Sequence, residues 1–120
     1  MNIPPSSLRF TQDSIAANFT SGDNINQEIE KIKSLWSWQR ESAVSEFEPL
    51  EIDQDRYDGR WYCNDNRRLY MFRVLEKQGY VSTVRVSNAE NYRILGLILF
   101  KAAYKNFALL RAKFVVNVLI

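Results

Sequence analysis

An amphipathic helix predicted between two β-rich stretches is the feature that most limits how this chain can fold. Residues 60–63 resemble the returning strand of a hairpin, and residues 80–86 are rich in β-branched side chains. Between them Asp65 can cap a helix with an apolar stripe that includes Leu69 and Phe72. A hairpin joined to a further strand through one helix predicts a mixed sheet with helices on at least one face.

The remaining segments complete an α+β pattern. We expect the order strand, helix, helix, strand, strand, helix, strand, followed by a C-terminal helix. Residues 37–48 are acidic and irregular, with at most a helical turn near residues 43–47. The other expected elements are an extended segment at 8–11, a helix starting at 12–14 that carries Ile15 and Phe19, a helix at 23–36, a strand from 49 and a last helix opened by a capping box at 87–90.

The length of 120 residues, with 46% hydrophobic residues, fits one globular domain with its own core. We expect an α+β domain at residues 1–87 and a C-terminal helical extension at residues 88–120 packed on it. The apolar residues 94–120 could also form a homodimer interface or hold a protein partner.

The residue types present exclude several kinds of chemistry. The chain has no histidine, which excludes Ser-His-Asp, Cys-His and histidine-metal sites. Its one cysteine, Cys63, excludes an internal disulfide framework and a cysteine-cluster zinc site. Four aspartates could bind Mg²⁺, namely Asp53, Asp55, Asp58 and Asp65. The first three surround a polar turn where aspartate is expected for backbone reasons, so no dedicated metal site is predicted, and Asp65 near a bound phosphate is the best single candidate.

Charge is distributed unevenly along the chain. Residues 1–60 hold six Lys and Arg against eleven Asp and Glu, whereas residues 61–120 hold ten against three. This asymmetry indicates either a basic face for phosphate, nucleic acid or an acidic partner, or pairing between the two halves within one fold. The sequence leaves both interpretations open.

No targeting or membrane-spanning segment is predicted. The first ten residues include two prolines and lack an apolar core of the signal-peptide kind. The most apolar run, residues 94–100, is far shorter than the ~20 residues that a spanning helix needs. We therefore expect no membrane insertion and a reducing, intracellular location such as the cytoplasm.

Two adjacent arginines, Arg67 and Arg68, fall in the first turn of the helix that Asp65 caps. The first turn of a helix already carries about half a positive charge and unpaired N–H groups, so cations there are unfavourable unless an anion joins them. Phosphate suits such a place because backbone donors and arginine forks can both bind it. The alternative is that the arginines pair with Asp65, Asp58 or Glu51 and tie the helix to the sheet.

The run Gly59-Arg60-Trp61-Tyr62, then Asp65-Asn66-Arg67-Arg68-Leu69, resembles the ParB/sulfiredoxin-like superfamily. In that family a hairpin strand leads into a helix through a short G-x-R-R or G-C-H-R box. The similarity covers residues 3–86 in order, including a strand that starts with Pro49-Leu50-Glu51-Ile52, and only the box is specific.

The resemblance implies a phosphate site for a nucleoside triphosphate, with Mg²⁺ as a possible companion, or for nucleic acid. By position, Arg67 and Arg68 would contact phosphate, Asn66 stands where the family has a functional Glu or Cys, and Asp65 replaces the box glycine. Asn66 is no carboxylate base, and Cys63 lies three residues too early for sulfinate reduction. No catalytic residue is therefore assigned.

We expect a nucleotide- or nucleic-acid-binding domain, and the residues leave open whether it is also a nucleotide hydrolase, a phosphotransferase or a nuclease. The alternative is a non-enzymatic protein-protein interaction module that keeps the scaffold. The residues expected to line the phosphate site are Gln12, Asp65, Asn66, Arg67, Arg68 and Arg73.

Overall fold

The computed structural model describes residues 1–12 and 15–89. The predicted helix beyond residue 89, and with it the proposed interface at residues 94–120, lies outside the described residues. The described part has the α+β architecture that the sequence predicts, with a mixed sheet and helices packed beside it.

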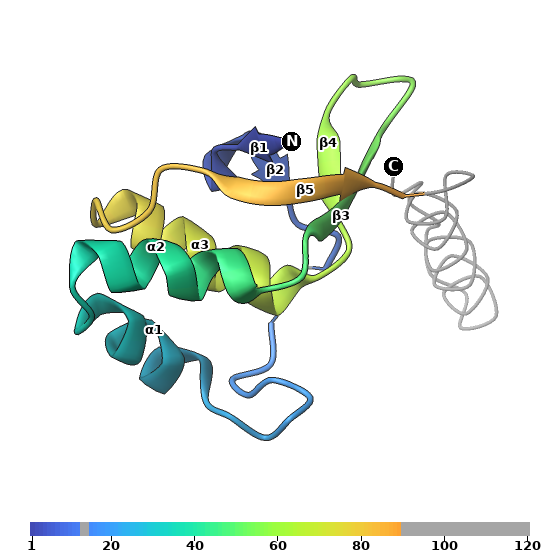
Figure 1. Ribbon diagram of the computed structural model, residues 1–120. Helices are drawn as coiled ribbons and strands as arrows, with labels where there is room; N and C mark the ends of the chain where they lie inside the picture. The colour runs from blue at the N-terminus through green and yellow to red at the C-terminus, as the bar shows by residue number, and fades with distance from the viewer. Residues whose placement is uncertain (13–14, 90–120) are drawn as a thin grey trace, which may run out of the picture.

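The sheet has five strands in the order β1-β5-β3-β4-β2. At its centre β3 lies parallel to β5 and antiparallel to β4, and the hairpin loop between β3 and β4 projects from the body (Figure 1). At the edges β1 is antiparallel to β5, and β2 is parallel to β4. The strands are β1 (Asn2–Ile3), β2 (Leu8–Arg9), β3 (Leu50–Gln54), β4 (Trp61–Cys63) and β5 (Val84–Asn88).

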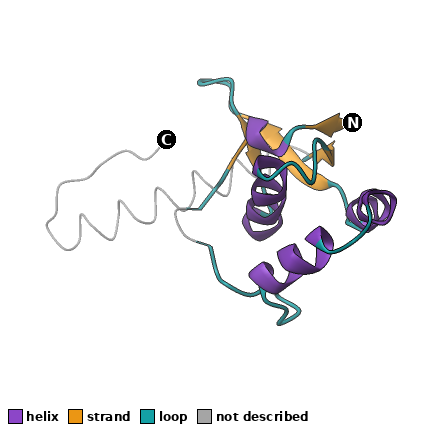
Figure 2. Ribbon diagram, turned by 90° about the vertical axis from the view of Figure 1, so that its left-hand side faces the viewer, coloured by secondary structure: helices purple, strands orange, loops and turns teal. Residues whose placement is uncertain are grey.

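The α-helices gather on one side of β5, with α1 farther from the sheet than α3 (Figures 1 and 2). They are α1 (Ile25–Lys33), α2 (Ser37–Glu46) and α3 (Asn66–Lys77), and the short 3₁₀ helix η1 (Pro5–Ser7) connects β1 to β2. Among the residues that the structure describes, no helix is long and apolar enough to cross a membrane.

The core forms where α3 faces the sheet. The stripe of α3 is buried as predicted: Leu69 and Leu75 are fully buried and Phe72 is 2% exposed. Phe72 also meets Phe47 edge-on, with 5.5 Å between the ring centroids. The other buried apolar residues come from four of the strands and from α1 and α3: Leu8, Ile25, Ile29, Ile32, Leu50, Ile52, Cys63, Met71, Val84 and Val86.

The helix predicted at residues 12–19 is not found among its described residues. Residues 15–19 are not helical, and Asn18 instead forms an isolated bridge with Asn24. The backbone N–H of Phe19 donates to the carbonyl of Asp23 (2.8 Å), closing a turn through Gly22, whose φ is +94°. Asn24 caps α1, because its side chain accepts from Gln27 N at 3.2 Å.

The sequence predicts an irregular segment at residues 37–48, whereas residues 37–46 form α2. This helix buries none of its side chains, so it lacks the apolar period that identifies a helix in a sequence. Its start is fixed by a local contact instead, since the N–H of Trp36 donates to Oε1 of Gln39 at 3.1 Å.

The strand predicted at 80–86 starts later and ends later, as β5. Tyr80 is part of the turn that ends α3 and not of the strand. Its N–H donates to the carbonyl of Leu75 (2.8 Å), and the preceding residue, Gly79, has a φ of +83°. Ser87 lies in β5 opposite Glu51, so the predicted helix cap at Ser87 is wrong. The strand includes Asn88, one residue past the expected domain boundary.

Candidate functional site

The connection from β4 to α3 forms the candidate site. β4 ends at Cys63 and α3 begins at Asn66, so only two residues turn the chain from strand to helix. Asp65 is the N-cap, as predicted, and its Oδ1 accepts from the N–H of Arg68 at 3.0 Å. The first turn of α3 contains no acidic residue, so the positive end of the helix meets two arginines.

Arg68 is held by groups of the protein itself. Its Nε lies 2.7 Å from Oδ2 of Asp65, and its Nη1 donates to the backbone carbonyl of Glu48 at 2.5 Å. Glu48 lies just ahead of β3, so Arg68 ties the start of α3 to the start of the central strand. Arg68 thus forms an ion pair with Asp65, which is one of the two alternatives that the sequence left open.

Arg67 has different surroundings. Its Nη1 donates to the backbone carbonyl of Asn18 at 2.7 Å, and no ion pair of Arg67 is found among the described residues. A neutral carbonyl satisfies one of the five N–H donors of a guanidinium group and leaves its charge uncompensated.

Asn66 connects α3 to the N-terminal segment. Asn66 is only 5% exposed to solvent. Its Oδ1 accepts from the N–H of Thr11 (2.7 Å), and its Nδ2 donates to Oγ1 of Thr11 (2.8 Å). Asn66 therefore positions residues 11 and 12 beside the helix start.

A polar cavity of about 200 Å³ opens at this place. Four of the six predicted site residues line it, namely Gln12, Asp65, Asn66 and Arg67, together with Phe19, Thr20 and Asn64. The other two lie elsewhere. Arg68 does not line the cavity, and the guanidinium carbon of Arg73 stands 5.2 Å from the ring centroid of Phe10.

No family model matches this chain, and no curated protein or solved structure is significantly similar to it. The function must therefore be argued from the geometry of the site.

Cys63 is fully buried directly below the site. Burial raises the pKa of its thiol to about 12, so the thiol stays protonated at neutral pH. Its Sγ donates to the carbonyl of Asp65 at 3.6 Å. This buried, neutral thiol is a packing group and lacks the thiolate that a nucleophile requires.

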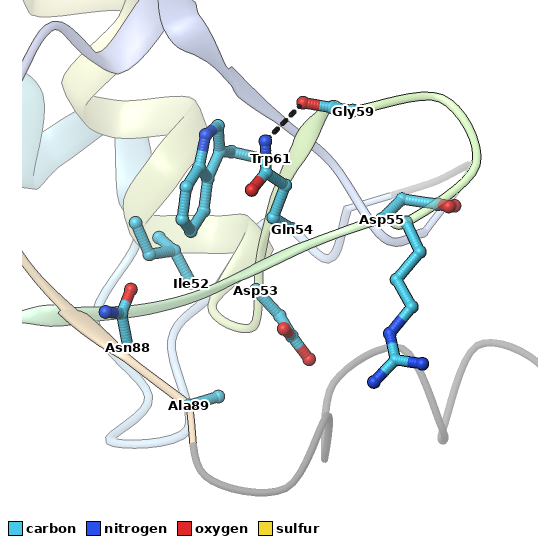
Figure 3. A pocket seen from close by; sticks show the side chains of 9 residues that line it. Ile52, Asp53, Gln54, Asp55, Gly59, Trp61, Asn88 and Ala89 are labelled. Atoms are coloured by element: carbon cyan, nitrogen blue, oxygen red, sulfur yellow. Dashed lines mark hydrogen bonds between the residues drawn. The ribbon is translucent and has the colours of Figure 1, made fainter.

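A second and larger hollow, of about 530 Å³, lies between the β3–β4 hairpin and the end of β5 (Figure 3). Sequence reasoning missed it because it grouped Asp53 with the aspartates of the turn. Asp53 is in fact a residue of β3 and is only 7% exposed. An aspartate inside a strand next to buried Ile52 is the signal that could have separated it from the turn.

Proposed function

We propose that this chain is a phosphate-binding domain of the ParB/sulfiredoxin-like kind, whose ligand is a nucleotide or a nucleic acid. The observation that carries the proposal is Arg67, which lines a polar cavity at the start of α3 without an ion pair among the described residues. The element order and the strand-to-helix turn through Asp65-Asn66-Arg67-Arg68 support the family assignment.

A phosphate group suits this cavity for electrostatic reasons. The start of a helix attracts an anion, and the first turn of α3 contains no acidic side chain, while the carboxylate of the N-cap Asp65 is paired with Arg68. Arg67 can exchange the carbonyl of Asn18 for phosphate oxygens, which are stronger acceptors and match the guanidinium fork. Gln12, held near by the Thr11–Asn66 contacts, adds an amide group to the same cavity.

The residues of the cavity support binding better than catalysis. The amide of Asn66 is engaged by Thr11, and the Asp65 carboxylate caps the helix and pairs with Arg68. A general base needs a carboxylate or similar group within reach of the attacking water. Hydrolysis of a nucleotide or phosphodiester would thus depend on Asp65, with Mg²⁺ bound to the phosphates as its helper.

Thermal unfolding with a panel of phosphate ligands tests the proposal. Tripolyphosphate, nucleoside triphosphates with Mg²⁺ and short oligonucleotides are each added to the full chain. A ligand at 100 times its dissociation constant adds ~2.7 kcal/mol to stability, which raises the Tm of a small domain by several degrees.

Arg67→Ala should abolish this rise while the free protein still folds. Lys31→Ala is the matched control, because it removes the same charge from an exposed position on α1 outside the cavity. If no phosphate ligand raises the Tm, or if the Arg67→Ala protein responds like the parent, the proposal is wrong and the interaction-module alternative takes its place.

A further inference from the structure

The hollow beside the β3–β4 hairpin contains a carboxylate whose surroundings do not satisfy it. Asp53 projects from β3 into the hollow, toward the side on which Ala89 lies (Figure 3). The residue is 7% exposed, and its Oδ2 is buried with no hydrogen-bond partner. A buried carboxylate oxygen without a partner costs free energy that a bound ligand would recover.

Two polar groups near Asp53 are committed to other partners. Tyr62 lies opposite Asp53 across the hairpin, but its hydroxyl donates to Oδ2 of Asp58 at 2.8 Å. The amide nitrogen of Gln54 donates to the carbonyl of Gly59 at 3.0 Å, as the dashed line in Figure 3 shows. Neither group supplies the donor that Oδ2 of Asp53 lacks.

We propose that this hollow binds a primary alkylammonium group, with the Asp53 carboxylate as its anchor. The ammonium group supplies the missing N–H donors and the opposite charge. Ala89 lies on the side toward which Asp53 projects and can contact the methylene stem of such a ligand, whereas Ile52 and Trp61 point to the other face of β3 (Figure 3). Its volume of about 530 Å³ admits a side chain or a small amine.

A metal ion fits the donor set less well. The part of the chain that the structure describes contains no group of three or more His, Cys, Asp or Glu residues arranged to hold a metal. The Oδ1 of Asp55, the other carboxylate of the hollow, already accepts from the N–H groups of Tyr57 (2.7 Å) and Asp58 (3.4 Å). A single buried carboxylate offers too few ligands for a metal ion, but it can accept from one ammonium group.

Isothermal titration of the full chain with two alkylammonium probes tests this proposal. n-Butylamine represents a free amine, and Nα-acetyl-lysine amide represents the lysine side chain of a polypeptide, so their relative affinities distinguish the two sources. Tetramethylammonium chloride at the same concentration controls for ionic strength, because it carries the charge but no N–H donor. We expect at least one primary amine to bind and tetramethylammonium to bind at least tenfold more weakly.

Three variants sharpen the result. Asp53→Asn should weaken amine binding at least tenfold, whereas Glu46→Gln, which neutralises an exposed carboxylate on α2, should leave it unchanged. Arg56 lines the same hollow, so Arg56→Gln should strengthen binding of a cation by removing a like charge. An anion site would respond to Arg56→Gln in the opposite direction.

The proposal is overturned by any of three results. One is the absence of binding of both primary amines, and another is equal binding by the parent and the Asp53→Asn protein. The third is a Tm several degrees lower for ligand-free Asp53→Asn than for the parent, since the carboxylate would then already have a partner in the free protein. Phosphate binding at Arg67 is measured separately and should survive Asp53→Asn, so the two proposals fail independently.

Discussion

Among single residues, Asn66 has the clearest structural role in the candidate site. Its amide satisfies both the backbone N–H and the hydroxyl of Thr11, which lies 55 positions earlier in the chain. The sequence shows Asn66 as part of the Asp65-Asn66-Arg67-Arg68 box, but it does not indicate that Thr11 is its partner. It also cannot distinguish Arg67 from Arg68, because only the fold places the Glu48 carbonyl beside Arg68 and the Asn18 carbonyl beside Arg67.

Asn66→Ala should destabilise the protein by about 1–3 kcal/mol, because it leaves the partly buried N–H of Thr11 without its acceptor. Urea unfolding measures the change. Thr11→Val removes the contacts of the hydroxyl with Asn66 Nδ2 and with the carbonyl of Cys63 but keeps the contact of the Thr11 N–H, so it should cost less. The double variant should show that the two losses are not additive. A loss below about 0.5 kcal/mol for Asn66→Ala, the size typical of surface substitutions, would contradict this role.

Cys63 makes stability depend on alkaline pH. Its pKa is raised to about 12 from an ordinary value of 9.0, so the folded state retains a proton that the unfolded state loses. Between pH 9 and 12 the folded state therefore binds more protons, and the free energy of unfolding should fall as pH rises through this range.

Cys63→Ala should show a weaker fall across the same pH range when unfolding is followed by circular dichroism. In the parent, thiol reagents should label Cys63 at pH 8 only after urea unfolds the chain. Rapid labelling of the native protein would show that the thiol is neither buried nor neutral.

At the scale of elements, the hairpin and α3 were predictable because each carries a local signal. Asp65 caps the helix, the stripe of Leu69, Phe72 and Leu75 faces the core, and Gly79 ends the helix. The start of α2 depends on one side-chain contact, and α2 has no buried stripe, so its sequence lacks the pattern that predicts a helix. Secondary structure was thus predictable where burial and local pattern coincide.

α2 should be the least protected of the three α-helices, because it buries no side chain. Gln39→Ala removes the side-chain acceptor of the Trp36 N–H and should weaken the helix by about 0.5–2 kcal/mol. Hydrogen exchange of the α2 amides should accelerate accordingly, with the α3 amides as the internal reference. Equal acceleration in both helices would show that α2 does not open independently.

At the scale of the whole molecule, the fold brings the N-terminal segment, the hairpin and α3 to one place. β2 pairs in parallel with β4, which carries Thr11 to the start of α3. The two ion pairs formed between described residues, Glu30–Lys33 and Asp65–Arg68, are both local. Among the described basic residues of the second half, Arg67 and Arg85 donate to backbone carbonyls, whereas Arg68 pairs with Asp65. The strand order that creates the cavity could not be predicted from charge.

If the ligand is a single-stranded nucleic acid, its affinity should fall steeply with salt, because each phosphate contact releases counterions. Arg67→Ala should lower affinity for all sequences and reduce the slope of log affinity against log salt by about one contact. Fluorescence anisotropy at several salt concentrations measures both quantities. A slope near zero would exclude phosphate contacts as the source of binding.

The most direct test of the phosphate site is a nuclear magnetic resonance titration of the ¹⁵N-labelled full chain with tripolyphosphate. The account predicts saturable shifts of the backbone amides at the start of α3 and at Gln12, and their loss in Arg67→Ala but not in Lys31→Ala. Shifts that are absent, or that are spread over the surface and unaffected by Arg67→Ala, would contradict it.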